Sequence, residues 1–508
     1  MARRLTLLGV MALIVLAFGF PGVALAHGGG QEPAAIAGPL SWGFLGFGAA
    51  VIVVVATILF TGQRRPGAHP SAADFERLTG LSGYLAKMRL FSRNARLFIV
   101  HVVGMDVIYG TWTVIFNLYL LAIGFDVAFI GLRIFLAAGA RALFSIPAGM
   151  LSDRMGRKLS FILGDGGGAV LSLIAISTAD PTLLLLTGAL SGIFGSLHGV
   201  AEPAFMAENS QDFERVHLFS VSDGTRIAAA IIGSALAGLV PLLFAGSSEA
   251  EVVSLYRIVA YVGIGGWFAS LIPAILLEQV APAAVAGGGW RHIFAGVKHP
   301  QRIWRLTAPE VMIAAGAGFI LPMLNVFFRE NLASTEVEIG ATFAAGQAFL
   351  VVGAFLAPLV AARLGKVRSV VFTRLAGIPF IMLIAFSPDV GSALGSVFTV
   401  AGLAHIARIT FSNMASPVRS AFAMEILDPG ERGTQVGIQM ALASALSGVA
   451  SYLGAQLMNN GDFRTPFFLM AAFYLGATML FWRFFARWEV EHPFAAPAVA
   501  AETPARAD

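Results

Sequence analysis

The feature that most constrains this 508-residue chain is a series of long apolar segments separated by short polar stretches. Twelve of them follow residue 96, and each is near the ~20 residues that an α-helix needs to cross the hydrocarbon core of a bilayer. Charged residues make up only 12% of the chain, against roughly 25% in a soluble domain. The sequence therefore predicts an all-α polytopic membrane protein. The segments lie at 97–123, 127–148, 159–177, 183–206, 219–243, 255–278, 305–328, 338–362, 368–387, 391–415, 433–457 and 466–487.

The first 26 residues form a segment of a different kind. A basic start at Arg3 and Arg4 precedes an apolar run and an Ala-x-Ala end, which together indicate a secretory signal peptide at 1–26. An uncleaved first transmembrane helix is the alternative interpretation. A further apolar segment at 40–62 is long enough to span a bilayer, and a basic linker follows at 63–96. We therefore predict one extra transmembrane helix ahead of the twelve-helix body.

Lysine and arginine are divided unequally between the two sets of loops. When residues 63–96 are placed in the cytoplasm, the cytoplasmic segments hold 23 of these side chains, and the external loops hold only Arg329 and Arg464. Basic residues gather on the cytoplasmic side of inserted membrane proteins. Both ends of the twelve-helix body are therefore predicted to be cytoplasmic, in a multi-pass protein of the plasma (inner) membrane.

The loop between the second and third segments reads GMLSDRMGRK over residues 149–158. In this loop the sequence resembles the major facilitator superfamily of secondary transporters, whose signature there is Gly-x-Leu-x-Asp-Arg-x-Gly-Arg-Lys. The resemblance implies two six-helix bundles related by a pseudo-twofold axis along the membrane normal, and a conformational switch on the cytoplasmic side. The expected switch residues of this loop are Gly149, Asp153, Arg154, Gly156, Arg157 and Lys158.

The types of these residues suit a latch between two moving parts. Gly149 permits close helix packing, and Gly156 permits a tight turn with positive φ. The Asp153 carboxylate can sit near the N-terminus of a helix in the opposite half, where the helix dipole favours negative charge. The neighbouring basic side chains can bind carboxylates or anionic headgroups.

A second loop with part of the same motif indicates an internal repeat. Arg363 and Gly365 follow Arg154 and Gly156 at a spacing of 209 residues. A second pair, Glu208 and Glu425, is 217 residues apart, and we expect these carboxylates to be the partners of Arg154 and Arg363. The predicted parts of the chain are an N-terminal bundle at 97–278, a cytoplasmic central loop at 279–304, a C-terminal bundle at 305–487 and a cytoplasmic tail at 488–508.

Ionisable and polar side chains at membrane depth are costly, and each is a candidate for function. In the first segment of the twelve, Asp106, Tyr109 and Asn117 share one helical face. The resemblance implies that the first, fourth, seventh and tenth helices line the cavity. The alternative is an interhelical pair that holds a bundle together, and we interpret Asp165 and Arg374 in that way. The candidates for a substrate or proton cavity are Asp106, Tyr109, Asn117, His198, Glu202, Arg226, Glu310, Asn325, His405 and Arg408.

These observations predict a secondary transporter of a small solute that works by alternating access, with proton coupling through Asp106 or Glu202. The resemblance slightly favours export over import. Exporters of this superfamily often carry a glycine-rich motif with Gly-Pro in the fifth helix, and here Gly224 and Gly233 have the expected separation, although Ala237-Gly238 stands where Gly-Pro would be. The alternative is a non-transporting membrane receptor or scaffold with the same fold. No hydrolase elbow, metalloprotease motif or Walker loop occurs. We expect no enzymatic activity, no cofactor, no metal site and no nucleic-acid partner, and we expect a monomer in the lipid bilayer.

Overall fold

The computed structural model describes residues 34–61, 78, 80–239, 249–279, 297–394 and 396–491. The predicted signal peptide lies outside these residues, as do most of the central loop and most of the C-terminal tail. The same holds for 62–77 of the predicted basic linker. Within the described residues the regular structure is helical throughout, as predicted.

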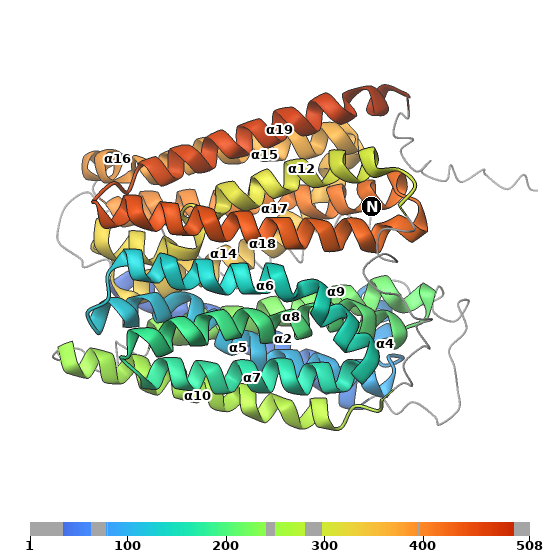
Figure 1. Ribbon diagram of the computed structural model, residues 1–508, viewed down its shortest axis with the longest axis horizontal. Coiled ribbons are helices and arrows are strands. Elements are labelled where there is room, and N and C mark those ends of the chain that lie inside the picture. Colours follow the sequence, from blue (N-terminus) through green and yellow to red (C-terminus); the bar gives the residue numbers. More distant parts are fainter. Residues whose placement is uncertain are drawn as a thin grey trace, which may run out of the picture.

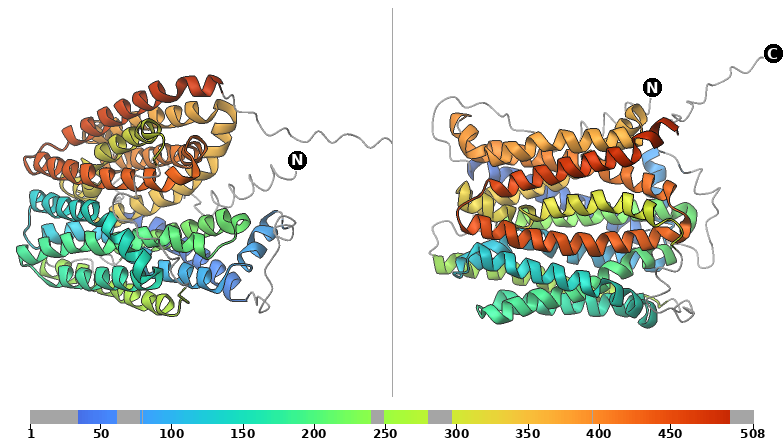
Figure 2. Two further views of the ribbon diagram at one scale, coloured as in Figure 1. Left: turned by 45° about the vertical axis from the view of Figure 1, so that its right-hand side comes forward. Right: turned by 45° about the horizontal axis from the view of Figure 1, so that its top comes forward.

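Two groups of helices lie side by side as two halves (Figures 1 and 2). The first half contains α5 (Arg93–Ala122), α6 (Val127–Met155), α7 (Arg157–Ser177), α8 (Pro181–Glu208), α9 (Asp212–Leu239) and α10 (Glu249–Ile275). The second half contains α12 (Pro300–Gly318), α14 (Glu336–Leu364), α15 (Lys366–Ala385), the short α16 (Ser387–Leu394), α17 (Val397–Ile426), α18 (Pro429–Asn459) and α19 (Thr465–Glu491). Two further helices, α2 (Ala34–Thr61) and α4 (Gly80–Met88), precede the first half.

Ten helical segments of the described chain are long and apolar enough to cross a membrane. They correspond to ten of the twelve predicted spans, and the other two correspond to α9 and α17. These two helices are 28 and 30 residues long, but ionisable side chains such as Arg226 and Arg408 interrupt their apolar character. Twelve membrane crossings, and a membrane-spanning role for α2, therefore stay predictions.

The seventh predicted span is broken. Helix α12 ends at Gly318, and the chain continues through the 3-10 turn η2 (Leu321–Met323), the single turn α13 (Leu324–Val326) and the π-helical η3 (Phe327–Asn331). Pro322 has no N–H group to donate and disfavours a continuous α-helix at this point. The break turns Asn325 toward α5 of the other half.

The halves meet at one end of the bundle, which we call the closed end. Helix α6 packs on α18 there, and α9 packs on α14. A Cβ atom at Gly131 of α6 would stand only 2.1 Å from the Ala455 side chain of α18. Likewise, a Cβ at Gly340 of α14 would stand 2.8 Å from the Cα of Gly238 of α9. Glycine thus lets the helix backbones of the two halves approach closely.

At the opposite end, which carries the 149–158 loop and which we call the loop end, the halves are apart. Gly149 lies about five turns from Gly131 on the same face of α6, yet a Cβ there would have no described atom of another segment within 4 Å. Helix α18 behaves in the same way. A Cβ at Gly448 would touch Ala138, whereas Gly437, about three turns nearer the loop end, faces open space among the described residues.

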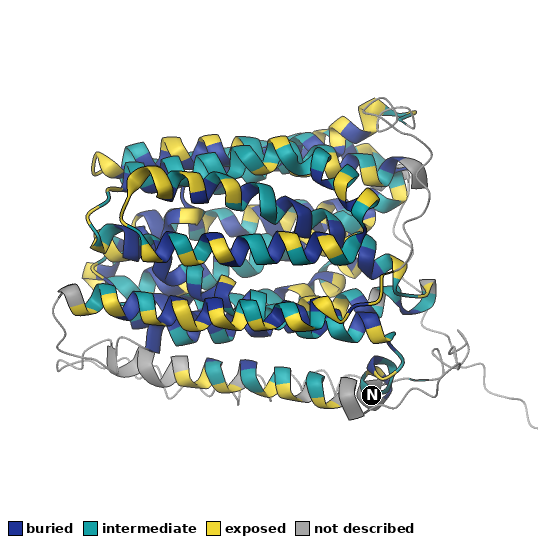
Figure 3. Ribbon diagram, turned by 60° about the horizontal axis from the view of Figure 1, so that its bottom comes forward, coloured by how far each residue is buried: buried dark blue, intermediate teal, exposed yellow. Residues whose placement is uncertain are grey.

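Helix α2 lies against both halves near the closed end. Its Phe44 is buried with Ile231 and Ala235 of α9 and with Ala344 and Ala348 of α14. The remaining helices carry exposed residues along their outer faces and buried residues toward their neighbours (Figure 3). Large buried clusters fill each half, and one of them runs across the closed end.

Candidate functional site

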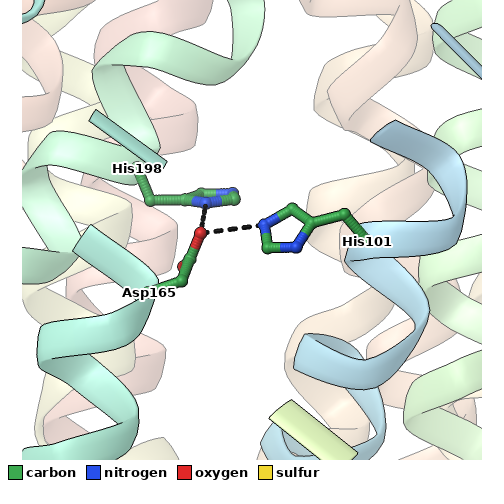
Figure 4. A group of neighbouring side chains, drawn as sticks. All are labelled: His101, Asp165 and His198. Carbon is green, nitrogen blue, oxygen red and sulfur yellow. Dashed lines mark hydrogen bonds and ion pairs between the residues drawn. The ribbon is translucent and has the colours of Figure 1, made fainter. Parts of the chain in front are cut away.

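Six ionisable side chains from four helices come together inside the first half. At the most buried part of this group, Asp165 of α7 lies between two histidines (Figure 4). Its Oδ2 atom is 2.9 Å from Nε2 of His101 on α5 and 2.9 Å from Nδ1 of His198 on α8. The rings of Phe98 and Phe161 pack against both histidines. A carboxylate and two imidazoles are therefore held in an apolar setting.

The group continues from His198 toward α9. Nε2 of His198 lies 3.3 Å from Oε2 of Glu202, which is one turn further along α8. Arg226 of α9 binds both carboxylate oxygens of Glu202, at 2.7 and 2.8 Å, and its Nε donates to Oδ2 of Asp106 at 3.0 Å. One guanidinium thus joins carboxylates from α5 and α8. We call the six residues His101, Asp106, Asp165, His198, Glu202 and Arg226 the N-half network.

The second half contains a buried ion-pair group of its own. Glu310 of α12 pairs with Arg374 of α15, and its Oε2 lies 3.3 Å from Nε of Arg419 on α17. Glu310 and Arg374 stand 209 residues after His101 and Asp165, at the spacing that relates the two loops of the repeat. Equivalent positions therefore join equivalent helices in both halves, with the acid and the base exchanged.

Two predicted cavity residues instead connect the halves. Nδ2 of Asn117 donates to the carbonyl oxygen of Pro322 at 2.8 Å and to Oδ1 of Asn325 at 3.1 Å. Nδ2 of Asn325 donates in turn to the carbonyl oxygen of Val114 at 2.9 Å. These bonds fasten α5 to the broken seventh span at the closed end.

The remaining predicted cavity residues, Tyr109, His405 and Arg408, are not members of the N-half network. Tyr109 follows Asp106 by one turn and is 60% exposed. His405 and Arg408 are buried within the second half, where NH2 of Arg408 lies 3.5 Å from Nδ1 of His405. His405 also stacks on Phe343. The structure therefore does not bring His405 and Arg408 to the N-half network.

The two repeated loops have the backbone geometry that the glycines predict. Gly156 has φ = 87° and Gly365 has φ = 86°, a region that residues with a Cβ rarely adopt. Each glycine ends one helix and begins the next, α6 to α7 and α14 to α15. The expected tight turn at Gly156 is thus confirmed, and its counterpart in the second half has the same form.

The glutamates of the loops have partners other than the expected ones. Glu208 binds Nε of Arg157 at 3.0 Å, and Glu425 binds Lys366. The expected arginines, Arg154 and Arg363, are exposed. The expected pairing is wrong by three positions of the loop. In each half the glutamate binds the first basic side chain after the glycine, Arg157 or Lys366, and not the arginine before the glycine. Arg157 and Lys366 are themselves 209 residues apart, so the repeat extends to these pairs.

Two expectations for the first loop are not met in this conformation. Gly149 makes no close contact with another helix among the described residues, because the halves are apart at the loop end. Asp153 pairs with Arg157 on its own loop, at 2.6 Å. Lys158 is partly buried at the start of α7. It borders a small pocket that is also lined by Arg157, Phe205 and Glu208.

Comparison with known proteins assigns the chain to a family. The family model described as the Major Facilitator Superfamily matches residues 97–411. This chain belongs to the major facilitator superfamily. The superfamily is one of secondary transporters, so the protein is a multi-pass membrane protein of a transporter family, in agreement with the resemblance seen in the 149–158 loop.

Individual relatives of this superfamily are distant. The "Multidrug resistance protein MdtH" of Sodalis glossinidius (strain morsitans) is 26% identical over 327 residues, which are 64% of this chain and 74% of that protein. The nucleoside transporter NupG superimposes with a TM-score of 0.61 at 16% identity, covering 78% of this chain and 99% of that one. A D-xylose-proton symporter gives 0.59 at 14% identity, covering 77% and 97%. At these identities the solved structures show a shared fold.

Sequence analysis missed two members of the N-half network. His101 was not identified as a candidate, and Asp165 was interpreted as structural. Hydropathy does not distinguish them, because both lie inside long apolar segments. The repeat spacing would have found them, since Glu310 and Arg374 occupy the corresponding positions of the second half.

Proposed function

We propose that this protein is a proton-coupled secondary transporter that moves a small solute by alternating access, and that Asp106 is its proton-binding group. The observation that carries the proposal is the sharing of one guanidinium, that of Arg226, between Asp106 and Glu202. Asp106 lies on the same face of α5 as Asn117, which contacts the other half. The shared arginine therefore lies beside the surface along which the halves must move.

Asp106 is better suited than Glu202 to lose its partner. Arg226 gives Asp106 one hydrogen bond of 3.0 Å, but it gives Glu202 two bonds of 2.7 and 2.8 Å. A proton on Asp106 would leave Arg226 paired with Glu202, so no buried charge would be stranded. The charged or titratable groups near Asp106 are Arg226 from α9 and His198 and Glu202 from α8. Protonation would thus loosen α5 from α9 and keep α8 joined to α9.

Alternating access gives the two ends of the bundle complementary roles. In this superfamily fold, two parallel repeats rock about a site between them. The described conformation is closed at the end that carries Asn117 and Asn325 and open at the loop end. Because the loop is predicted to be cytoplasmic, this conformation corresponds to the one that faces the cytoplasm. In the opposite conformation, Gly149 would meet the second half and Asp153 would be available to it.

Export is the favoured direction. The relative MdtH is named a multidrug resistance protein, and part of the exporter glycine motif has a packing role in this chain. A Cβ at Gly233 of α9 would stand 2.0 Å from the carbonyl oxygen of Val107 on α5. Glycine at this position lets α9 and α5 approach closely, which brings Arg226 within reach of Asp106. The transported solute is proposed to be a small organic molecule, carried by a monomer.

The proposal is tested with purified protein in proteoliposomes. Solutes that raise its thermal stability are first selected from labelled nucleosides, sugars and organic cations, and their transport is then measured with and without a pH gradient. Asp106→Asn should abolish the part of transport that the gradient drives and leave solute binding intact. The control is Glu330→Gln, which removes an exposed carboxylate of η3 in the second half, outside the N-half network, and should transport normally.

Two results would contradict the proposal in different ways. Gradient-driven accumulation that persists in Asp106→Asn would exclude Asp106 as the coupling group. Binding of a solute without transport in any wild-type vesicle would instead favour the receptor or scaffold interpretation.

A further inference from the structure

Each of the two histidines of the N-half network has one ring nitrogen directed at Asp165 and the other directed at a second oxygen atom, in a hydrogen bond for His101 and in a longer ion-pair contact for His198. Nδ1 of His101 lies 2.7 Å from the backbone carbonyl oxygen of Ser270 on α10, to which it can only donate. Nε2 of His198 lies 3.3 Å from the carboxylate of Glu202. The remaining nitrogens, Nε2 of His101 and Nδ1 of His198, both point at the same oxygen of Asp165. A nitrogen that faces a carboxylate oxygen at 2.9 Å needs a proton or another cation between the two atoms.

This arrangement is the one that metal-binding histidines adopt. A histidine that ligates a metal donates its other ring N–H to a backbone carbonyl or a carboxylate, which fixes the tautomer and the orientation of the ring. Here the carbonyl of Ser270 accepts this hydrogen bond from His101, and the carboxylate of Glu202 lies 3.3 Å from the second ring nitrogen of His198 without forming a hydrogen bond. The ligating atoms of His101, Asp165 and His198 lie within 4.8 Å of one another, and all three residues are buried. Two imidazoles and one carboxylate suit zinc or a related divalent cation.

The charges of the network favour such a cation. The N-half network contains three carboxylates, those of Asp106, Asp165 and Glu202, and one permanently charged base, Arg226, which pairs with Asp106 and Glu202 but not with Asp165. A divalent cation bound to neutral imidazoles would supply the two missing positive charges at the deepest point, where an uncompensated carboxylate is most costly.

The repeat shows what is special to the first half. In the second half, the positions of His101 and Asp165 hold Glu310 and Arg374, which form a direct ion pair. At either repeat spacing, the position that corresponds to His198 holds an alanine, Ala407 or Ala415. The second half therefore ties the same helices with an ion pair and has no third ligand. At these positions the first half has His101 and Asp165, and His198 adds a third side chain that can bind a cation.

We infer that His101, Asp165 and His198 form a binding site for one divalent transition-metal cation, with zinc the best match. All three ligands belong to one half, on α5, α7 and α8, and no ligand of the site comes from the second half within the described residues. Rocking of the halves would leave the site intact. The cation is therefore a resident one that fastens three helices together, and it is distinct from the transported solute.

The test uses the full-length protein, purified in detergent on an affinity tag without histidine and stripped with a chelator. Zinc binding is measured by equilibrium dialysis with elemental analysis. Binding of cobalt(II) is followed by its visible absorption, which reports a nitrogen and oxygen ligand set because the chain has no cysteine. The expected result is one tightly bound cation per chain, together with a zinc-dependent rise in the thermal unfolding temperature.

Three variants and one control separate the site from other histidines. His101→Gln, His198→Gln and Asp165→Asn should each weaken zinc binding by roughly tenfold or more and remove the thermal shift. The control, His405→Ala, removes a buried histidine of the second half and should keep both. If Asp165→Asn fails to fold, the two glutamine variants carry the test. Absence of saturable zinc binding in the wild type, or equal loss in His405→Ala, would overturn the inference.

Discussion

The closed end can be forced open by a single methyl group. Gly340 of α14 faces α9 across the two halves, and a Cβ there would stand 2.7 Å from the carbonyl oxygen of Ser234 and 2.8 Å from the Cα of Gly238. Both atoms belong to the backbone, so no side-chain rotation relieves the contact. In Gly340→Ala the helices must separate at this point, and the conformation that is closed at this end loses stability.

The size of the effect follows from the packing. Extra volume in a well-packed contact costs about 1–3 kcal/mol, and the better helix propensity of alanine acts equally in both conformations because α14 stays helical. A difference of that size changes the ratio of two conformations by roughly 5- to 150-fold. We therefore expect Gly340→Ala to shift the population toward the conformation that is closed at the loop end.

The shift can be measured as a distance between spin labels. The chain has no cysteine, so Leu159→Cys on α7 and Arg368→Cys on α15 give unique attachment points. Both residues are exposed at the loop end, and they occupy equivalent positions of the two halves. Pulsed electron spin resonance should show a larger short-distance population in Gly340→Ala. The control is Gly437→Ala of α18, where the added methyl would have no atom of another described segment within 4 Å. Identical distance distributions in Gly340→Ala and wild type would refute the reasoning.

Three further predictions concern the 149–158 loop. Gly156→Ala places a Cβ on a backbone with φ = 87°, so it should lower the unfolding free energy by about 1–3 kcal/mol, seen as a lower unfolding temperature. Gly149→Ala has space in this conformation and should keep or raise that temperature while slowing transport, because the loop end could no longer close; equal transport rates would contradict this. Asp153→Asn should impair cycling without preventing membrane insertion, and normal turnover in vesicles would count against a switch role.

The order and nature of the helices were predictable because bilayer thickness fixes segment length. Local breaks were not predictable in the same way. The apolar pattern continues through Pro322. It therefore does not reveal that helix α12 ends at Gly318 and that the rest of the seventh span consists of a 3-10 turn, a single α-helical turn and a π-helical turn. The tenth predicted span was placed at 391–415, but α17 runs from Val397 to Ile426. The short helix α16 (Ser387–Leu394) occupies the region where that span is predicted to begin.

The site was only partly predictable, because a helical face says which way a side chain points but not which helix it meets. Four of the ten cavity candidates, Asp106, His198, Glu202 and Arg226, do come together. Asn117 shares a face with Asp106, yet it serves the contact between the halves. For each of these residues the deciding fact is tertiary, namely which neighbouring helix stands opposite.

The position of α2 has a consequence for the whole cycle. Because Phe44 packs against both α9 and α14, α2 bridges the interface between the two halves. When α9 and α14 separate at the closed end, α2 must lose its contact with one of these two helices. The surface that it covers on α14 is made of alanines, which offer little resistance to sliding. Helix α2 is thus placed to influence how readily the two halves separate at the closed end.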